Sequence, residues 1–228
     1  MFTSFLLIAL LARAEWHEER FSALYLDETL AGAREVSVVF ADLAGYTSFT
    51  EQRASEEVAA MLNEYYGRIV PLMERAGGEV HQIVGDELMV LFGKDDAVSE
   101  HAFLAAHAAL ALQNVAKRTA ADHPDWPGFR VGVSSGEVHA GLVGATRGHR
   151  KHGVVGDVVN LAARLQAAAP VGSVLIGEET FRALGPRAIV EPVPPMTMKG
   201  KSEPVRSYVL LGLERDRDGR EPSVHSDK

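Results

Sequence analysis

The sequence contains no cysteine among its 228 residues. Disulfide bonds, thiolate-bound zinc, iron–sulfur clusters and a cysteine nucleophile are therefore excluded. Positive charge is also scarce, since 23 lysines and arginines stand against 31 aspartates and glutamates and leave a formal net charge of −8. This balance argues against a nucleic-acid partner, whose binding surface would be basic. It leaves room for a small polyanion, because a bound metal ion or a few local cations reverse the field.

Long hydrophobic runs are also missing. Residues 1–12 are strongly apolar, but they are fewer than the about 20 residues that a membrane-spanning helix needs. The Ala12–Ala14 segment resembles a signal-peptide cleavage site, although no positive charge precedes the run. Three interpretations stay open: a signal peptide, the end of a longer membrane segment, or a helix that packs on a partner. Any membrane attachment is expected through these residues.

The remainder divides into three parts. Residues 13–34 have the charged, amphipathic pattern of a helical connector. Residues 35–211 alternate between strand and helix patterns and form the main domain. Residues 212–228 are charged and contain proline and glycine, so we expect a disordered tail. With 46% hydrophobic and 24% charged residues, the whole has the composition of an ordinary globular protein.

Within the main domain the hydrophobic pattern predicts a mixed fold. Strands are expected at 36–41, 79–84, 87–92, 129–134 and 137–143, and helices at 55–76, 97–121 and 157–169. This order predicts an α+β fold, with a ferredoxin-like (β-α-β-β-α-β) sandwich core and additional strands and helices. The helices are expected on one face of a mainly antiparallel sheet.

Two aspartates have matching positions in this pattern. Asp42 directly follows the predicted strand 36–41, and Asp86 lies at the tip of the hairpin between Val84 and Leu88. If the two strands are neighbours, both carboxylates emerge at one edge of the sheet. A hard divalent cation relieves the repulsion between such carboxylates, and Mg²⁺ takes one or two of them together with substrate phosphates. The alternative is that Asp42 caps a helix and Asp86 is a turn residue.

A second pair lies on the helix predicted at 157–169. Asn160 and Arg164 are four residues apart and therefore share one helical face. The planar guanidinium of arginine suits charge that develops on a phosphoryl group. The alternative is a solvated helix face without chemistry.

Taken together, these segments resemble the catalytic domain of the class III nucleotidyl cyclases, the adenylate and guanylate cyclases. The stretches that carry the resemblance keep the order of that family, and they are residues 39–47, 85–90, 132–138, 154–164 and Met198–Lys201. The similarity covers about residues 35–211.

The resemblance implies conversion of a nucleoside triphosphate, most simply ATP, to a 3′,5′-cyclic nucleotide and pyrophosphate. By position, two divalent cations (Mg²⁺ or Mn²⁺) are expected on Asp42, Asp86 and the main-chain carbonyl of Leu43. Asn160 would orient the ribose, Arg164 would stabilise charge on the α-phosphate and Lys199 would contact the terminal phosphates. The phosphate-loop candidates are Ala44, Gly45, Tyr46 and Thr47.

In the family the active site is shared between two domains. This chain carries both halves of the residue set, so the resemblance implies a homodimer with two equivalent sites. Because ATP is the expected substrate, we expect a cytoplasmic location, with or without membrane association.

Base selection is where the sequence departs from the family. Gln82 stands where adenylate cyclases have lysine, and Gly153 stands where they have aspartate or threonine. The glutamine amide both donates and accepts hydrogen bonds, and glycine has no side chain, so weak base discrimination is expected. The alternatives are a guanylate or mixed-specificity cyclase and a catalytically degenerate nucleotide-binding regulatory module.

Overall fold

The computed structural model describes residues 32–93, 100–144, 150–197 and 203–214. The predicted apolar segment 1–12, most of the connector 13–34, Lys199 and residues 215–228 of the tail lie outside the described residues. The first strand, β1 (Gly32–Leu43), already begins at Gly32. Residues 32–34 are therefore strand and not part of a helical connector.

Along the chain, the elements follow the predicted order up to the helix at residues 101–122. The two strands predicted at 129–134 and 137–143 are wrong, because one continuous strand, Phe129–Gly144, covers both. After β1 come α2 (Tyr46–Thr50), α3 (Ser55–Arg75), the hairpin β2 (Glu79–Val84) and β3 (Glu87–Phe92), α4 (His101–Asp122), β4 (Phe129–Gly144), β5 (Arg150–Val155), α5 (Asp157–Ala168), β6 (Val174–Gly177), α6 (Glu178–Leu184), a 3-10 turn (Gly185–Arg187), β7 (Ala188–Met196) and β8 (Val205–Leu213). Among the described helices, none is long and apolar enough to cross a membrane.

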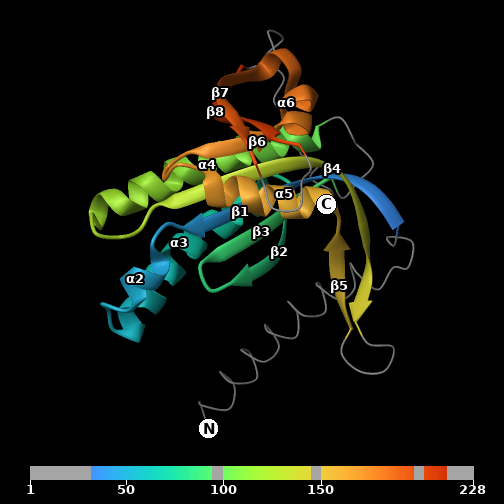
Figure 1. Cartoon of the computed structure of the whole chain (residues 1–228). Helices are drawn as coiled ribbons and strands as arrows, with labels where there is room; N and C mark the ends of the chain where they lie inside the picture. Colours follow the sequence, from blue (N-terminus) through green and yellow to red (C-terminus); the bar gives the residue numbers. More distant parts are fainter. Residues whose placement is uncertain (1–31, 94–99, 145–149, 198–202, 215–228) are drawn as a thin grey trace. The chain divides into compact units, whose positions relative to one another are not determined.

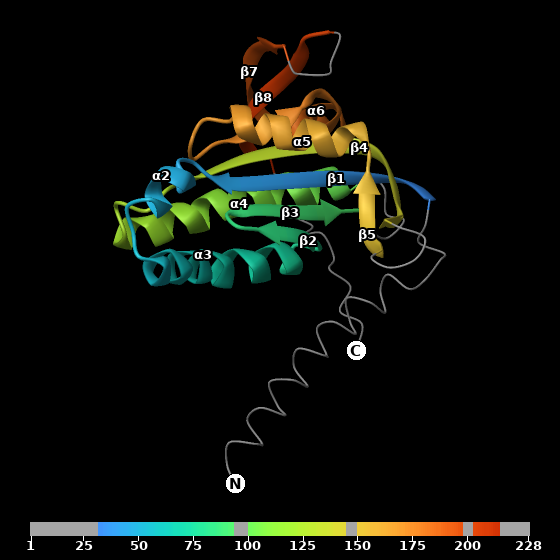
Figure 2. The ribbon, with the colours of Figure 1, turned by 60° about the horizontal axis from the view of Figure 1, so that its bottom comes forward.

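The described strands form one sheet in the order β2-β3-β1-β4-β6-β8-β7, and β5 pairs with the distal half of β4. Figure 2 shows β2, β3, β1 and β4 side by side. This order is the ferredoxin-like core, with β3 antiparallel to β1 and to β2. The α+β class predicted from the sequence is confirmed, and β4 with β6 forms a parallel pair.

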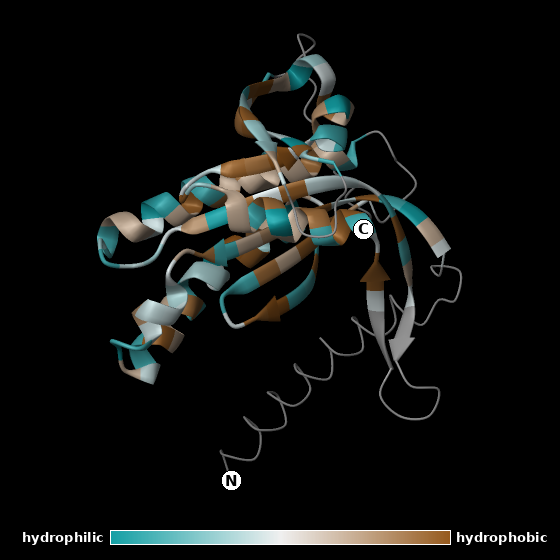
Figure 3. Cartoon of the chain, viewed as in Figure 1, coloured by the Kyte–Doolittle hydropathy of each residue, from teal (hydrophilic) through white to brown (hydrophobic). Residues whose placement is uncertain are grey.

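The helices cover both faces of the sheet, and this corrects the expectation of helices on one face. In β6, which is hydrophobic along most of its length (Figure 3), Val174 and Ile176 belong to the main core that α3, α4 and α6 cover. Leu175 points to the opposite face, as the two-residue period of a strand requires. There it packs with Leu165 and Ala169, at the end of α5. Figure 1 shows α5 in front of the sheet and α4 behind it.

Helix α5 lies unusually close to β4. A Cβ atom placed on Gly132 of β4 would lie 2.3 Å from the carbonyl oxygen of Ala162 and 2.3 Å from the amide nitrogen of Gln166. Only glycine allows this contact between the backbones of a strand and a helix. The contact fixes α5 against the strand next to β1.

This contact predicts how much stability the fold loses when a methyl group is added at position 132. Gly132→Ala should destabilise the fold by about 1–3 kcal/mol, because the methyl group meets backbone atoms that cannot rotate away. Gly67→Ala is the control, since nothing lies within 4 Å of a Cβ at that position in α3. It should stabilise by up to about 1 kcal/mol, through helix propensity. Urea unfolding measures both, and equal stability of Gly132→Ala and wild type would contradict the close packing.

Candidate functional site

Strand pairing brings Asp42 and Asp86 together at one end of β1. Asp42 is the last residue but one of β1, so it lies within the strand and not after it as predicted. The register of β1 with β3 ends at the pair of Ala41 and Leu88. Since Val84 pairs with Glu87, Asp86 belongs to a two-residue loop. The carboxyl groups of Asp42 and Asp86 are hydrogen-bonded to each other.

The closeness of the two carboxyl groups changes the acidity of Asp86. Burial, then the hydrogen bond to Asp42 and the negative charge of Asp42, raise the pKa of Asp86 to about 7. The backbone N–H groups of Asp86 and Leu43 act in the opposite direction, because they donate to the ionised carboxylate. With this pKa, Asp86 is protonated in a substantial fraction of molecules near neutral pH. Burial and the charge of Asp42 also raise the pKa of Glu87.

Two further side chains hold Asp42, and the sequence did not single them out. Arg130 of β4 donates from Nη2 to Oδ2 of Asp42 at 2.5 Å, and Gln166 of α5 donates from Nε2 to the same oxygen at 3.2 Å. The side of the sheet on which Arg130 lies could have been predicted from the two-residue period of a strand. This period puts residue 130 on the same face as Gly132 and opposite the core residues Val131 and Val133. Gln166 could have been noticed because it is a polar residue on the buried face of α5.

Asn160 and Arg164 lie on α5, one helical turn apart. Asn160 is exposed, whereas Nη1 of Arg164 is buried and has no hydrogen-bond partner among the described residues. Within the described part of the chain, neither side chain has a hydrogen bond or ion pair to Asp42 or Asp86. A single copy therefore brings together the two aspartates but does not join them to the Asn160/Arg164 pair. Nη1 of Arg164 therefore has a donor that an anion could accept.

The remaining predicted residues are spread over the loop after β1 and two strands. The Ala44 amide donates to the carbonyl of Gly128 at 2.9 Å, and Gly45 precedes α2, whose first residues are Tyr46 and Thr47. Gln82 is half-buried on β2, beside an irregularity in its pairing with β3. Gly153 lies on β5 opposite Gly141. Lys199 is outside the described residues.

The donor set at Asp42 and Asp86 fits a hard divalent cation. In the residues that the structure describes, no group of three or more histidine, aspartate or glutamate side chains could hold a metal ion. Magnesium needs only one or two protein carboxylates when substrate phosphates and water complete its octahedral shell. Burial, the hydrogen bond to Asp42 and the charge of Asp42 raise the pKa of Asp86, and a cation bound between the two carboxyl groups would relieve the last of these effects.

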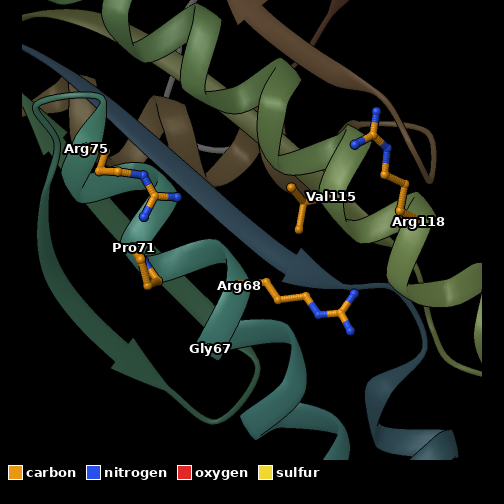
Figure 4. Close-up of a pocket in the computed structure, with 6 residues that line it drawn as sticks. All are labelled: Gly67, Arg68, Pro71, Arg75, Val115 and Arg118. Atoms are coloured by element: carbon orange, nitrogen blue, oxygen red, sulfur yellow. The ribbon is translucent and has the colours of Figure 1, made fainter.

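A separate groove lies between α3 and α4 (Figure 4). Its volume is about 510 Å³, and its lining residues are Gly67, Arg68, Pro71, Arg75, Val115 and Arg118. None of the predicted site residues is among them. The guanidinium of Arg68 is paired with Glu64 at 2.7 Å and donates to Thr119 at 3.2 Å, so helix packing accounts for it.

Comparison with known proteins identifies the family. The family model described as adenylate and guanylate cyclase catalytic domain matches residues 30–212, which is more than half of the chain. The chain belongs to this family, as the motifs around Asp42, Asp86 and Asn160 had suggested.

Curated relatives and solved structures agree with this assignment. An adenylate cyclase of Mycobacterium tuberculosis is 30% identical over 178 residues, which are 78% of this chain and 40% of that protein. The chain thus spans less than half the length of this relative. The crystal structure of the adenylyl cyclase CyaB from P. aeruginosa superimposes with a TM-score of 0.74 at 26% identity, covering 82% of this chain and 98% of that one. The guanylyl cyclase Cya2 gives a TM-score of 0.71 at 28% identity, over 82% and 97%.

The raised pKa of Asp86 predicts how the metal-free fold responds to pH. An aspartate with a raised pKa stabilises the fold most below its unfolded pKa of about 3.9, and this contribution disappears as the pH rises through the folded value of about 7. Asp86→Asn retains a hydrogen bond to Asp42 at every pH. In EDTA, the midpoint of urea unfolding of Asp86→Asn should therefore rise relative to that of wild type as the pH increases from 5.5 to 8. A difference that is the same at both pH values would contradict the raised pKa.

Proposed function

We propose that this chain is the catalytic domain of an adenylate cyclase, which converts ATP to 3′,5′-cyclic AMP and pyrophosphate. The observation that carries the proposal is the pair of Asp42 and Asp86, whose carboxyl groups are hydrogen-bonded to each other at one end of β1. Family membership and the adenylate cyclases among its relatives support the choice of reaction.

In this proposal Asp42, Asp86 and the carbonyl of Leu43 hold two divalent cations, Mg²⁺ or Mn²⁺. Such cations lower the pKa of the ribose 3′-hydroxyl and neutralise the triphosphate and its leaving group. Arg130 balances the charge of Asp42 in the free chain. Arg130 therefore supplies, from the same copy as Asp42, a positive charge beside the expected position of the triphosphate. Lys199 and the stretch Ala44–Thr47 remain candidate phosphate contacts.

The second half of the reaction centre is proposed to come from a second copy. Asn160 would orient the ribose, and Arg164 would stabilise the charge that develops on the α-phosphate during in-line attack. The unpaired Nη1 of Arg164 supports this role, since a buried guanidinium nitrogen without a partner is costly unless an anion occupies the site. Ile83 and Val84, which are 44% and 58% exposed on the edge strand β2, offer apolar surface that a second copy would cover.

Base recognition is proposed to be weak. Gln82 offers one amide, which can pair with adenine or guanine, and Gly153 offers no side chain. A guanylate or mixed-specificity cyclase is the second candidate function. The fold similarity to the guanylyl cyclase Cya2, almost as close as that to CyaB, favours keeping this candidate. A degenerate module that binds nucleotide without turnover is the remaining alternative.

The first test of the proposal is a product assay. The purified chain, incubated with ATP and Mn²⁺ or Mg²⁺, should release pyrophosphate and cyclic AMP in equal amounts. Asp86→Asn should lose at least about 100-fold in activity, because one of the two carboxylates is gone. Bound nucleotide without any product, under every metal condition, would favour the degenerate module.

The shared site predicts complementation between two inactive variants. Asp42→Ala and Arg164→Ala should each be inactive alone, but a mixed dimer assembles one intact site from the Asp42 of one copy and the Arg164 of the other. Co-expression with two different affinity tags isolates the mixed dimer. An inactive mixed dimer, with both tags present at equal stoichiometry, would refute the sharing of sites.

Base selectivity is tested by steady-state kinetics. We expect the kcat/KM values for ATP and GTP to differ by less than about 100-fold, because a site with few buried polar groups discriminates poorly. Gln82→Lys, which restores the residue type of typical adenylate cyclases, should shift the ratio toward ATP. A wild-type preference of several orders of magnitude for one base would contradict weak discrimination.

A further inference from the structure

Two neighbouring tyrosines on α3 donate hydrogen bonds in different directions. The hydroxyl of Tyr65 donates to the carbonyl of Pro127 at 3.0 Å, and its ring packs edge-on against Phe129 with the ring centres 5.1 Å apart. The hydroxyl of Tyr66 donates to the carbonyl of Gly85 at 3.1 Å. Tyr65 thus belongs to the core, whereas Tyr66 holds the loop that carries Asp86.

That loop needs a support from outside the sheet. It extends beyond the last pairs of both neighbouring strands, Val84 with Glu87 and Ala41 with Leu88. Gly85 has a φ of 60°, in the left-handed region, and β2 is the edge strand of the sheet. A two-residue loop at a sheet edge can tilt, and a tilt would change the separation of the carboxyl groups of Asp86 and Asp42.

The position of the Tyr66 hydroxyl agrees with such a support. Burial, and after it the negative charges of the nearby Asp86 and Asp42, raise the pKa of Tyr66. The hydroxyl therefore keeps its proton and remains a donor. The bond joins α3, which packs in the main core, to the residue that directly precedes Asp86.

We propose that Tyr66 is a positioning residue for the metal site: by holding the carbonyl of Gly85, it fixes Asp86 at the distance from Asp42 that a divalent cation requires. The inference rests on the proposed cation site at Asp42 and Asp86. It adds a residue that touches neither cation nor nucleotide. Residues that hold the ligands of a metal commonly change its affinity by about 10–100-fold when they are replaced.

The test compares Tyr66→Phe with the matched control Tyr65→Phe. Each variant removes one hydroxyl from the same helix and one hydrogen bond to a backbone carbonyl. The probe is Mn²⁺ itself, and its binding to the nucleotide-free chain is followed by electron paramagnetic resonance. We expect Tyr66→Phe to bind Mn²⁺ about tenfold more weakly and Tyr65→Phe to bind it as wild type does. Urea unfolding should show that both variants are folded.

Steady-state kinetics give an independent readout. In Tyr66→Phe the Mn²⁺ concentration for half-maximal activity should rise about tenfold, while kcat at saturating Mn²⁺ stays within about twofold of wild type. A merely structural role predicts equal loss of stability in both variants and unchanged Mn²⁺ affinity, and this result would overturn the inference. It differs from the failure of the proposed function, in which the wild-type chain itself binds no Mn²⁺ and the inference falls with the site.

Discussion

Burial of two carboxyl groups that strand pairing holds together, with the repulsion between them, is the constraint on which the candidate site depends. The register of β1 with β3, and the two-residue loop before β3, keep Asp42 and Asp86 close to each other. The neighbouring groups act to compensate this repulsion. The raised pKa of Asp86 favours its protonated form, and Arg130 and Gln166 both donate to the same oxygen of Asp42. A divalent cation at this pair, as proposed, would meet the same electrostatic demand.

Helix α5 links this charged pair to the rest of the reaction centre. Gly132 of β4 allows the backbone of α5 to contact that strand. Leu165 of α5 packs on the face of the sheet opposite the main core. Gln166, at its end, bonds to Asp42, while Asn160 and Arg164 lie earlier along the same helix. The position of the helix therefore depends on a glycine in a strand rather than on the residues that would do the chemistry.

The sequence predicted those parts of the site that depend on local pattern. Asp42 and Asp86 could be paired because a strand, a hairpin and their turn residues are recognisable within short windows, and Asn160 and Arg164 because helical spacing puts them on one face. Arg130, Gln166 and Tyr66 were missed, since each acts on a residue at least 19 positions away in the chain. Short-range periodicity carries no information on which distant residue a side chain will meet.

The same limit explains the errors in the fold. Residues 32–34 belong to β1, although their own pattern predicted a helical connector. The placement of α5 on the opposite face follows from the side to which Leu175 points, which is a property of the sheet and not of the helix. By contrast, the α+β class follows from alternating hydrophobic periods and could be predicted.

In the proposed homodimer the double attachment of α5 has an evolutionary consequence. Through Gln166 the helix serves the aspartates of its own copy, and through Asn160 and Arg164 it serves the nucleotide bound mainly by the other. Because both copies carry the same mutation, a change that shifts this helix would affect both reaction centres. In each centre it would displace the support of Asp42 as well as Asn160 and Arg164. Selection should therefore tolerate drift in α5 less readily than in α3, and new substrate preferences should arise first in the strands around Gln82.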